Sequence, residues 1–159
     1  MSITATEFKT NLGKYLMLAA TEDIFMLATQ RINAALNMQK TAVLLLNKEG
    51  QFVSHVLQGY SPDEKDALAG QPIVMDTEFF DPEKAVLVTA EDNPGRFSVL
   101  RDTLGLPYFI SVPVVIENEV VAILITGRME EMPPFLSRLG SSDVETLQAI
   151  SSLLATVWV

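Results

Sequence analysis

The chain of 159 residues contains no cysteine and only one histidine, His55. The lack of cysteine excludes a disulfide framework, a thiolate metal site and a thioether-linked chromophore, and it fits a reducing compartment. One histidine with no second nitrogen or sulfur ligand cannot build a zinc site, and no triad partners are apparent. A glycine-rich phosphate loop, a nucleophile elbow and a zinc-protease helix are also missing. We therefore expect no enzyme activity, no metal and no cofactor.

Positive charge is scarce as well. Eleven Lys and Arg residues face twenty Asp and Glu residues, and the formal net charge of −9 repels nucleic-acid phosphates and anionic lipids. The sequence has no apolar run long enough to span a bilayer and no basic, then apolar, secretory start. We expect a cytoplasmic protein that contacts neither nucleic acid nor membrane. Its hydrophobic content of 48% is ample for one folded domain.

Helical patterns occur near both ends of the chain. Apolar residues recur at spacings of three and four over 6–20 and again from Ile24 to Ala35, which predicts one long helix with a break between these two parts. The run Ser142–Glu145 matches a capping box and predicts the start of a helix that continues to the last residue. This helix has an apolar end without a stop signal, so we expect an output domain outside this sequence.

The middle of the chain is rich in strand patterns. The clearest is Tyr108–Thr126, two β-prone runs around the turn Glu117-Asn118-Glu119, which predicts a central hairpin. A Ser-Pro-Asp-Glu start predicts a short helix over 62–68, and a second over 96–104 is expected to end at Gly105. The remaining strands are predicted over 41–47, 51–57, 73–75 and 85–89.

Residues 24–159 resemble a GAF domain, both in the order of these elements and in the stretch Leu106–Gly127, where Ser-Val-Pro begins an apolar strand and a second strand ends in glycine. The resemblance implies an α+β fold, with a central antiparallel sheet of about six strands and helices on both faces. It also implies a regulatory sensor domain that binds a small molecule and pairs as a homodimer through its terminal helices. Residues 1–23 would then be an N-terminal helical extension.

The ligand pocket implied by the resemblance lies over one sheet face, beneath residues 79–104. Arg96 and Arg101 follow the turn Asn93-Pro94-Gly95 in this segment, and their guanidinium groups suit carboxylate or phosphate ligands. They could equally be surface arginines paired with Asp92 or Asp102. The ligand contacts that we expect are Phe80, Asp92, Arg96, Phe97, Arg101, Tyr108 and Ser111.

The ligand itself is not predicted, because the signature of the cyclic-nucleotide subtype is incomplete and the bilin-binding subtype needs a cysteine. Two other functions stay open. One is a ligand-free interaction or dimerisation scaffold, whose pocket is filled by its own side chains. The other is a DNA-binding antitoxin, since Ile3–Ile24 weakly resembles the start of prevent-host-death antitoxins, although the acidic charge offers little to DNA.

Overall fold

The computed structural model describes residues 24–89, 91–93, 95–129 and 139–157. Its centre is one six-stranded sheet in the order β3-β2-β1-β6-β5-β4, and every neighbouring pair is antiparallel. The predicted α+β fold is confirmed. The strands are β1 Lys40–Leu46, β2 Phe52–Gln58, β3 Pro72–Ile73, β4 Val86–Val88, β5 Tyr108–Ile116 and β6 Glu119–Arg128.

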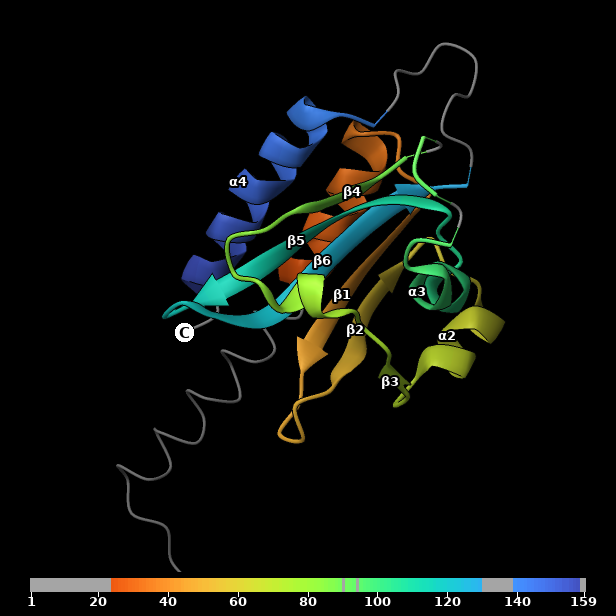
Figure 1. Cartoon of the computed structure of the whole chain (residues 1–159), viewed down its shortest axis with the longest axis horizontal. Coiled ribbons are helices and arrows are strands. Elements are labelled where there is room, and N and C mark those ends of the chain that lie inside the picture. The colour runs from red at the N-terminus through yellow and green to blue at the C-terminus, as the bar shows by residue number, and fades with distance from the viewer. Residues whose placement is uncertain (1–23, 90, 94, 130–138, 158–159) are drawn as a thin grey trace, which may run out of the picture.

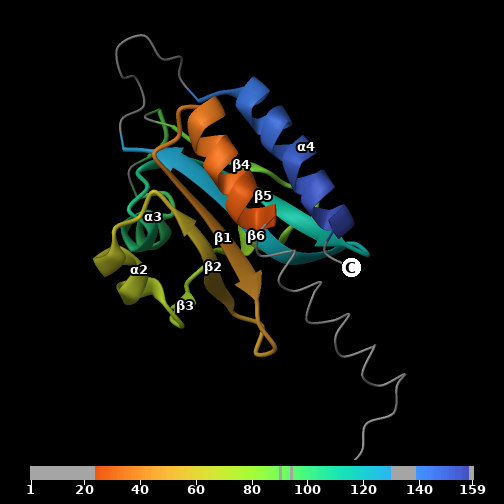
Figure 2. The ribbon, with the colours of Figure 1, turned by 180° about the vertical axis from the view of Figure 1, so that it is seen from behind.

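Helices cover both faces of this sheet (Figures 1 and 2). A helix over 24–35 and α4, Ser141–Val157, lie side by side on one face, which we call the helix face. The opposite face, which we call the α3 face, carries α2, Pro62–Leu68, the short 3-10 helix η1, Thr77–Phe80, and α3, Ser98–Leu104. The predicted helix over 6–20 lies outside the described residues.

Two hydrophobic cores lie on the two sides of the sheet, because successive side chains of a strand point to opposite faces. On β1, Leu44 belongs to the core of the α3 face and Val43 to the core of the helix face. On β5, Phe109 and Ile110 divide in the same way. A strand buried on both faces reads as a continuous apolar run, which explains the sequence of β5 and β6.

The turns and helix starts follow from local chemistry. Glu117 and Asn118, between β5 and β6, have φ angles of 52° and 65°, the left-handed conformation of a type I′ hairpin turn. The capping box of α2 is present, with the Ser61 side chain accepting from the backbone N–H of Glu64. The predicted turn between the two apolar strands and the predicted start of the helix over 62–68 are therefore confirmed, and the turn type and the capping box are added by the structure.

Two predicted helix starts were displaced. α3 begins at Ser98 and not at Arg96, because Phe97 takes a left-handed φ of 54° that cannot continue a helix. α4 begins at Ser141, and the carboxylate that accepts from the backbone N–H of Gly140 is that of Asp143, at 3.0 Å, in place of the predicted pair. A capping motif in the sequence thus fixed the helix start only to within one or two residues.

A β-bulge places His55. β1 pairs Val43 with Val56 and Leu44 with Ser54, so His55 is the extra residue of β2. Its ring packs edge-on against Phe25 of the helix over 24–35, with centroids 5.9 Å apart. This position between strand and helix agrees with a structural histidine.

Candidate functional site

The segment that covers the α3 face ends in α3, and two buried leucines anchor this helix. Leu100 and Leu104 are both 1% exposed and pack into the core of the α3 face. The residue before the helix, Phe97, has φ 54° and ψ 34°. For a residue with a side chain, this left-handed conformation costs about 1–2 kcal/mol. The start of α3 is therefore held under backbone strain.

Beneath α3 the predicted pocket is occupied by phenylalanine rings. The Phe97 ring lies 4.8 Å from that of Phe79 and 6.5 Å from that of Phe109, and the last two are 6.3 Å apart. Phe79 and Phe109 are buried, whereas Phe97 is half-buried at the rim. We call these three residues the phenylalanine cluster. Its rings fill the space between η1, α3 and β5.

Arg96 is neutralised by carboxylates of its own chain. Its guanidinium lies 2.7 Å from Asp92 and 3.7 Å from Glu78, donates to the Leu87 carbonyl at 3.4 Å, and covers the Phe97 ring at 4.8 Å. The pKa of Asp92 is lowered, first by the backbone N–H of Thr89 and then by Arg96. The pairing with Asp92 weighed from the sequence is thus present. An anionic ligand would compete with both carboxylates for Arg96.

Arg101 is different, since no carboxylate among the described residues pairs with it. One terminal nitrogen donates to the Asn93 carbonyl at 3.4 Å, and its buried Nε has no hydrogen-bond partner. Asp102, the partner considered from the sequence, makes no ion pair with Arg101. Arg101 is therefore the guanidinium of this segment with unused hydrogen-bonding capacity.

The other expected contacts divide between locations. Ser111 is buried and lies two residues after Phe109 on β5, so both side chains are on the α3 face. In the sheet, Ser111 is paired with Val86 of β4. Tyr108 instead packs against the core of the helix face. Phe80 is 43% exposed and packs on Phe52, with ring centroids 5.2 Å apart, outside the phenylalanine cluster. Of the seven expected contacts, only Tyr108 faces away, whereas Phe80, Asp92, Arg96, Phe97, Arg101 and Ser111 lie on the α3 face.

The sequence analysis missed Phe79 and Phe109, although strand alternation could have identified Phe109. Strand alternation puts residues an odd number apart on opposite faces, so Tyr108 and Ser111 could not line the same pocket, whereas Phe109 and Ser111 could. Phe79 and Phe80 are neighbours of the same type in a short 3-10 helix, and only packing shows that Phe79 is the buried one.

Tyr60 was also missed, and it connects the end of α3 to α2. Its hydroxyl donates to the Leu104 carbonyl at 2.8 Å. Burial raises the pKa of Tyr60, with a smaller effect from Glu64, so the hydroxyl keeps its proton and remains a donor.

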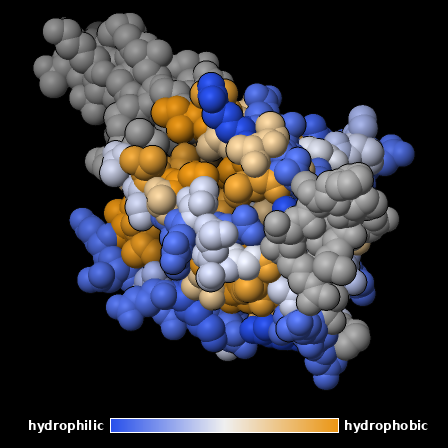
Figure 3. All heavy atoms as spheres, turned by 90° about the horizontal axis from the view of Figure 1, so that it is seen from above, coloured by the Kyte–Doolittle hydropathy of each residue, from blue (hydrophilic) through white to orange (hydrophobic). Residues whose placement is uncertain are grey.

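Further hollows lie on the helix-face side, where none of the expected ligand contacts gathers. An apolar groove between the helix over 24–35 and α4 encloses about 360 Å³ at one end and about 250 Å³ at the other. Seen from above, apolar side chains reach the surface in a patch that hydrophilic residues border (Figure 3). The groove is lined by Ile24, Leu27, Ala28, Arg31, Ile32, Ala35, Leu36, Thr146, Ile150, Leu153, Leu154 and Thr156.

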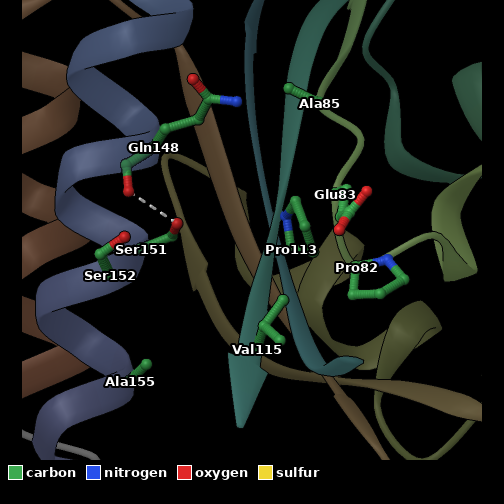
Figure 4. Close-up of a pocket in the computed structure, with 9 residues that line it drawn as sticks. All are labelled: Pro82, Glu83, Ala85, Pro113, Val115, Gln148, Ser151, Ser152 and Ala155. Carbon is green, nitrogen blue, oxygen red and sulfur yellow. Dashed lines mark hydrogen bonds between the residues drawn. The ribbon is translucent and has the colours of Figure 1, made fainter. Parts of the chain in front are cut away.

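A smaller cleft of about 230 Å³ separates α4 from the outer edge of β5 (Figure 4). It exists because β4 pairs only with 109–111 of β5 and leaves Pro113 and Val115 uncovered. On the α4 side the Ser151 hydroxyl donates to the Gln148 carbonyl at 3.0 Å, so it is already satisfied. None of the expected ligand contacts lines this cleft.

A sequence model of the GAF domain matches residues 21–157. The chain belongs to the GAF domain family. GAF domains are sensory and regulatory domains of signalling proteins, and the predicted resemblance is confirmed. The match begins three residues before the predicted boundary at Ile24, which remains a prediction, as does the antitoxin-like resemblance of 3–24.

Solved GAF domains share this fold at low sequence identity. The structure is similar to the GAF domain/HD domain protein of Geobacter sulfurreducens, with a TM-score of 0.69, 15% identity, and 87% and 91% of the two chains covered. The GAF domain of an Acinetobacter phosphoenolpyruvate-protein phosphotransferase is similar with a TM-score of 0.66 and 13% identity, and the match covers 87% of this chain and 81% of that one. The photoproduct state of a GAF domain from Synechocystis has a TM-score of 0.63 and 17% identity, and the match covers 87% of this chain and 93% of that one. No curated protein matches the sequence.

Among the described residues, no helix has the length and apolar character needed to cross a membrane. Within the same residues, no three His, Asp or Glu side chains are grouped so that they could hold a metal ion.

Proposed function

We propose that this GAF domain is a cytoplasmic sensor that binds a small ligand beneath α3 and signals through its terminal helices, without catalysis and without contacting nucleic acid or membrane. The observation that carries the proposal is the combination of a half-buried, strained Phe97 with Arg101, which pairs with no carboxylate among the described residues and whose buried Nε has no hydrogen-bond partner there. Phe97 marks the place where a ligand would enter, and the Arg101 guanidinium supplies a positive charge that would bind it.

The phenylalanine cluster defines how a ligand would enter. A ligand ring that takes the place of the Phe97 ring would stack on Phe79 and Phe109, where aromatic pairs contribute about 0.5–1.5 kcal/mol beyond buried area. Movement of Phe97 would also release its left-handed strain, which lowers the cost of opening. Occupation and movement of α3 are thus linked.

The ligand chemistry follows from the groups that remain. The cluster is apolar, and Arg101 offers a guanidinium that suits a carboxylate. A mostly apolar site with a few polar contacts is typical of small-molecule pockets. We therefore propose a small aromatic acid in preference to a phosphate ligand, which would need more donors than the described residues of this segment leave free.

Thermal unfolding with added ligands tests this proposal. Benzoate and phenylacetate are the probes, with toluene and benzyl alcohol as uncharged counterparts. A ligand at one hundred times its Kd stabilises by about 2.7 kcal/mol, which raises Tm by roughly 2–4 °C per kcal/mol for a chain of this size. Phe97→Ala should bind the acids more tightly because its site is open, and Arg101→Gln should remove the preference for acids.

The matched control is Arg31→Gln, which removes an arginine from the helix face. It should leave the preference for acids unchanged. If no probe stabilises either the natural protein or Phe97→Ala, the binding proposal is wrong.

A ligand-free scaffold is the second candidate, and the filled phenylalanine cluster specifically favours it. Three rings in mutual contact give a complete core that needs no ligand. In this case Phe97→Ala loses stability that none of the probes restores, while the oligomeric state is unchanged.

We also propose that the apolar groove is the surface on which two copies pair. Leu27 and Leu153 are 51% and 68% exposed, although each lies in an otherwise well-packed helix layer. Burying one leucine contributes about 1.5–3 kcal/mol, so a helical dimer would gain from both copies of both residues.

Light scattering after size exclusion tests the pairing. The natural protein should have twice the monomer mass, and Leu27→Glu and Leu153→Glu should shift it to the monomer because they place carboxylates in the contact. Val99→Glu is the control, since Val99 is similarly exposed at 57% but lies on α3. A monomeric natural protein with an intact fold would overturn the dimer.

A further inference from the structure

The first two residues of β1 connect the two faces of the sheet. β1 lies in the middle of the sheet between β2 and β6, with α2 and α3 on one side and the helix over 24–35 on the other (Figures 1 and 2). Lys40 and Thr41 are neighbours in this strand, so their side chains point to opposite faces. One peptide bond therefore separates contacts to the α3 face from contacts to the helix face.

On the α3 face, Lys40 joins both short helices. Its ammonium donates to the Glu64 carboxylate in α2 at 2.6 Å and lies 4.8 Å above the Tyr60 ring. The Tyr60 hydroxyl in turn donates to the Leu104 carbonyl in the last turn of α3. The fit is close at Gly105, because a Cβ atom there would lie 2.9 Å from the Lys40 ammonium. A shift of the end of α3 would therefore displace the Lys40 ammonium.

On the helix face, Thr41 is fully buried and joins the helix over 24–35 to β6. Its hydroxyl is hydrogen-bonded to the Asn33 side chain and lies 2.6 Å from the Thr126 hydroxyl. Two residues further along β6, the buried Arg128 guanidinium donates to the Leu36 and Asn37 carbonyls at 2.8 and 3.2 Å. These bonds hold the carboxyl end of the helix over 24–35 against the sheet.

We propose that Lys40 and Thr41 form a joint through which movement of α3 reaches the helix over 24–35. Rotation of the peptide between them to follow Tyr60 and α3 would carry the Thr41 hydroxyl away from Asn33. Because Thr41 is fully buried, loss of its hydrogen bond to Asn33 is costly, and we expect the helix over 24–35 to follow the shift. As a signalling route the joint rests on the proposed function, but the coupling itself belongs to the unliganded protein.

Hydrogen exchange without any ligand tests the joint. Tyr60→Phe removes one hydroxyl that contacts α3 and nothing on the helix face. We expect amides of 24–35 to exchange at least about fivefold faster, the lower end of ordinary coupling between sites. The reciprocal variant Thr41→Val should speed exchange in α3 by a similar factor, and Thr41→Ser, which keeps the hydroxyl, should restore the natural rates.

Two references separate coupling from general loosening. Lys84→Met breaks the 2.9 Å ion pair between Lys84 and Glu78 on the α3 face, away from β1, and should leave 24–35 unchanged. Amides of β5 report global opening. Unchanged exchange in 24–35 after Tyr60→Phe, or equal acceleration in β5, overturns the joint. Since no ligand is present, this result is independent of whether a ligand is found.

Discussion

Glycine and alanine at position 97 should reverse their usual order of stability. Phe97 is the residue before α3, and its φ of 54° lies in the left-handed region that L-residues avoid. In regular structure, glycine is less stable than alanine because it gains more freedom in the unfolded chain. At position 97 the native conformation itself favours glycine, so the comparison isolates backbone strain from side-chain packing.

The magnitudes follow from burial and conformation. A fully buried Phe→Ala change costs about 3–5 kcal/mol, and the half-exposed ring of Phe97 should cost about 2 kcal/mol in either variant. The left-handed conformation costs alanine about 1–2 kcal/mol, against about 0.4–1 kcal/mol of extra unfolded-state entropy for glycine. Phe97→Gly should therefore be more stable than Phe97→Ala by roughly 0.5–1 kcal/mol.

Urea unfolding of both variants measures this difference. Ala149, exposed in the interior of α4, is the control, because Ala149→Gly should cost about 1 kcal/mol in an ordinary helix. If Phe97→Gly is no more stable than Phe97→Ala while Ala149→Gly loses the expected amount, position 97 is not strained. Release of strain at Phe97 would then not help α3 to open.

Two further predictions concern stability. Gly127→Ala should cost about 3 kcal/mol in urea unfolding, because its Cβ would lie 2.2 Å from the Tyr108 carbonyl oxygen. Gly50→Ala has open space around it and should cost only about 1–2 kcal/mol for its left-handed φ of 76°, so equal losses would contradict a close approach at Gly127. The Lys40 hydrogen bond is the main cause that lowers the pKa of Glu64 to about 2, so the pair stabilises the fold above about pH 4.5 and this contribution is lost as the pH falls towards 2. Because Glu64 is partly exposed, the free energy of unfolding of the natural protein should exceed that of Glu64→Gln by only about 0.5–1 kcal/mol at pH 7, and this difference should shrink as the pH falls from about 4.5 through about 2. A difference independent of pH would contradict the ion pair.

Local chemistry explains which parts of the fold were predictable. The hairpin Tyr108–Thr126 and the helix over 62–68 were correctly predicted, because a turn, a proline and a capping box act within a few residues. The predicted start of α3 was wrong, because nothing near Phe97 in the sequence indicates a left-handed residue. The Phe97 ring packs on Phe79, eighteen positions earlier, and a contact between such distant segments cannot be read from local sequence.

The candidate site was predicted less completely. The sequence selected the covering segment and its two arginines, yet pairing decides their chemistry: Arg96 is held by Asp92 and Glu78, and Arg101 is not. The carboxylate of Glu78 lies eighteen positions from Arg96, in η1, so no local spacing rule connects them.

The sequence by itself determined the alternation of buried strands, the turns and the α+β class, because these depend on residue type and short-range spacing. Only the tertiary structure decided that the space beneath α3 holds three phenylalanine rings, that Tyr108 faces away from it, and that Lys40 and Thr41 join the two faces. These features depend on which distant segments meet, and that is set by the packing of the whole sheet and its helices.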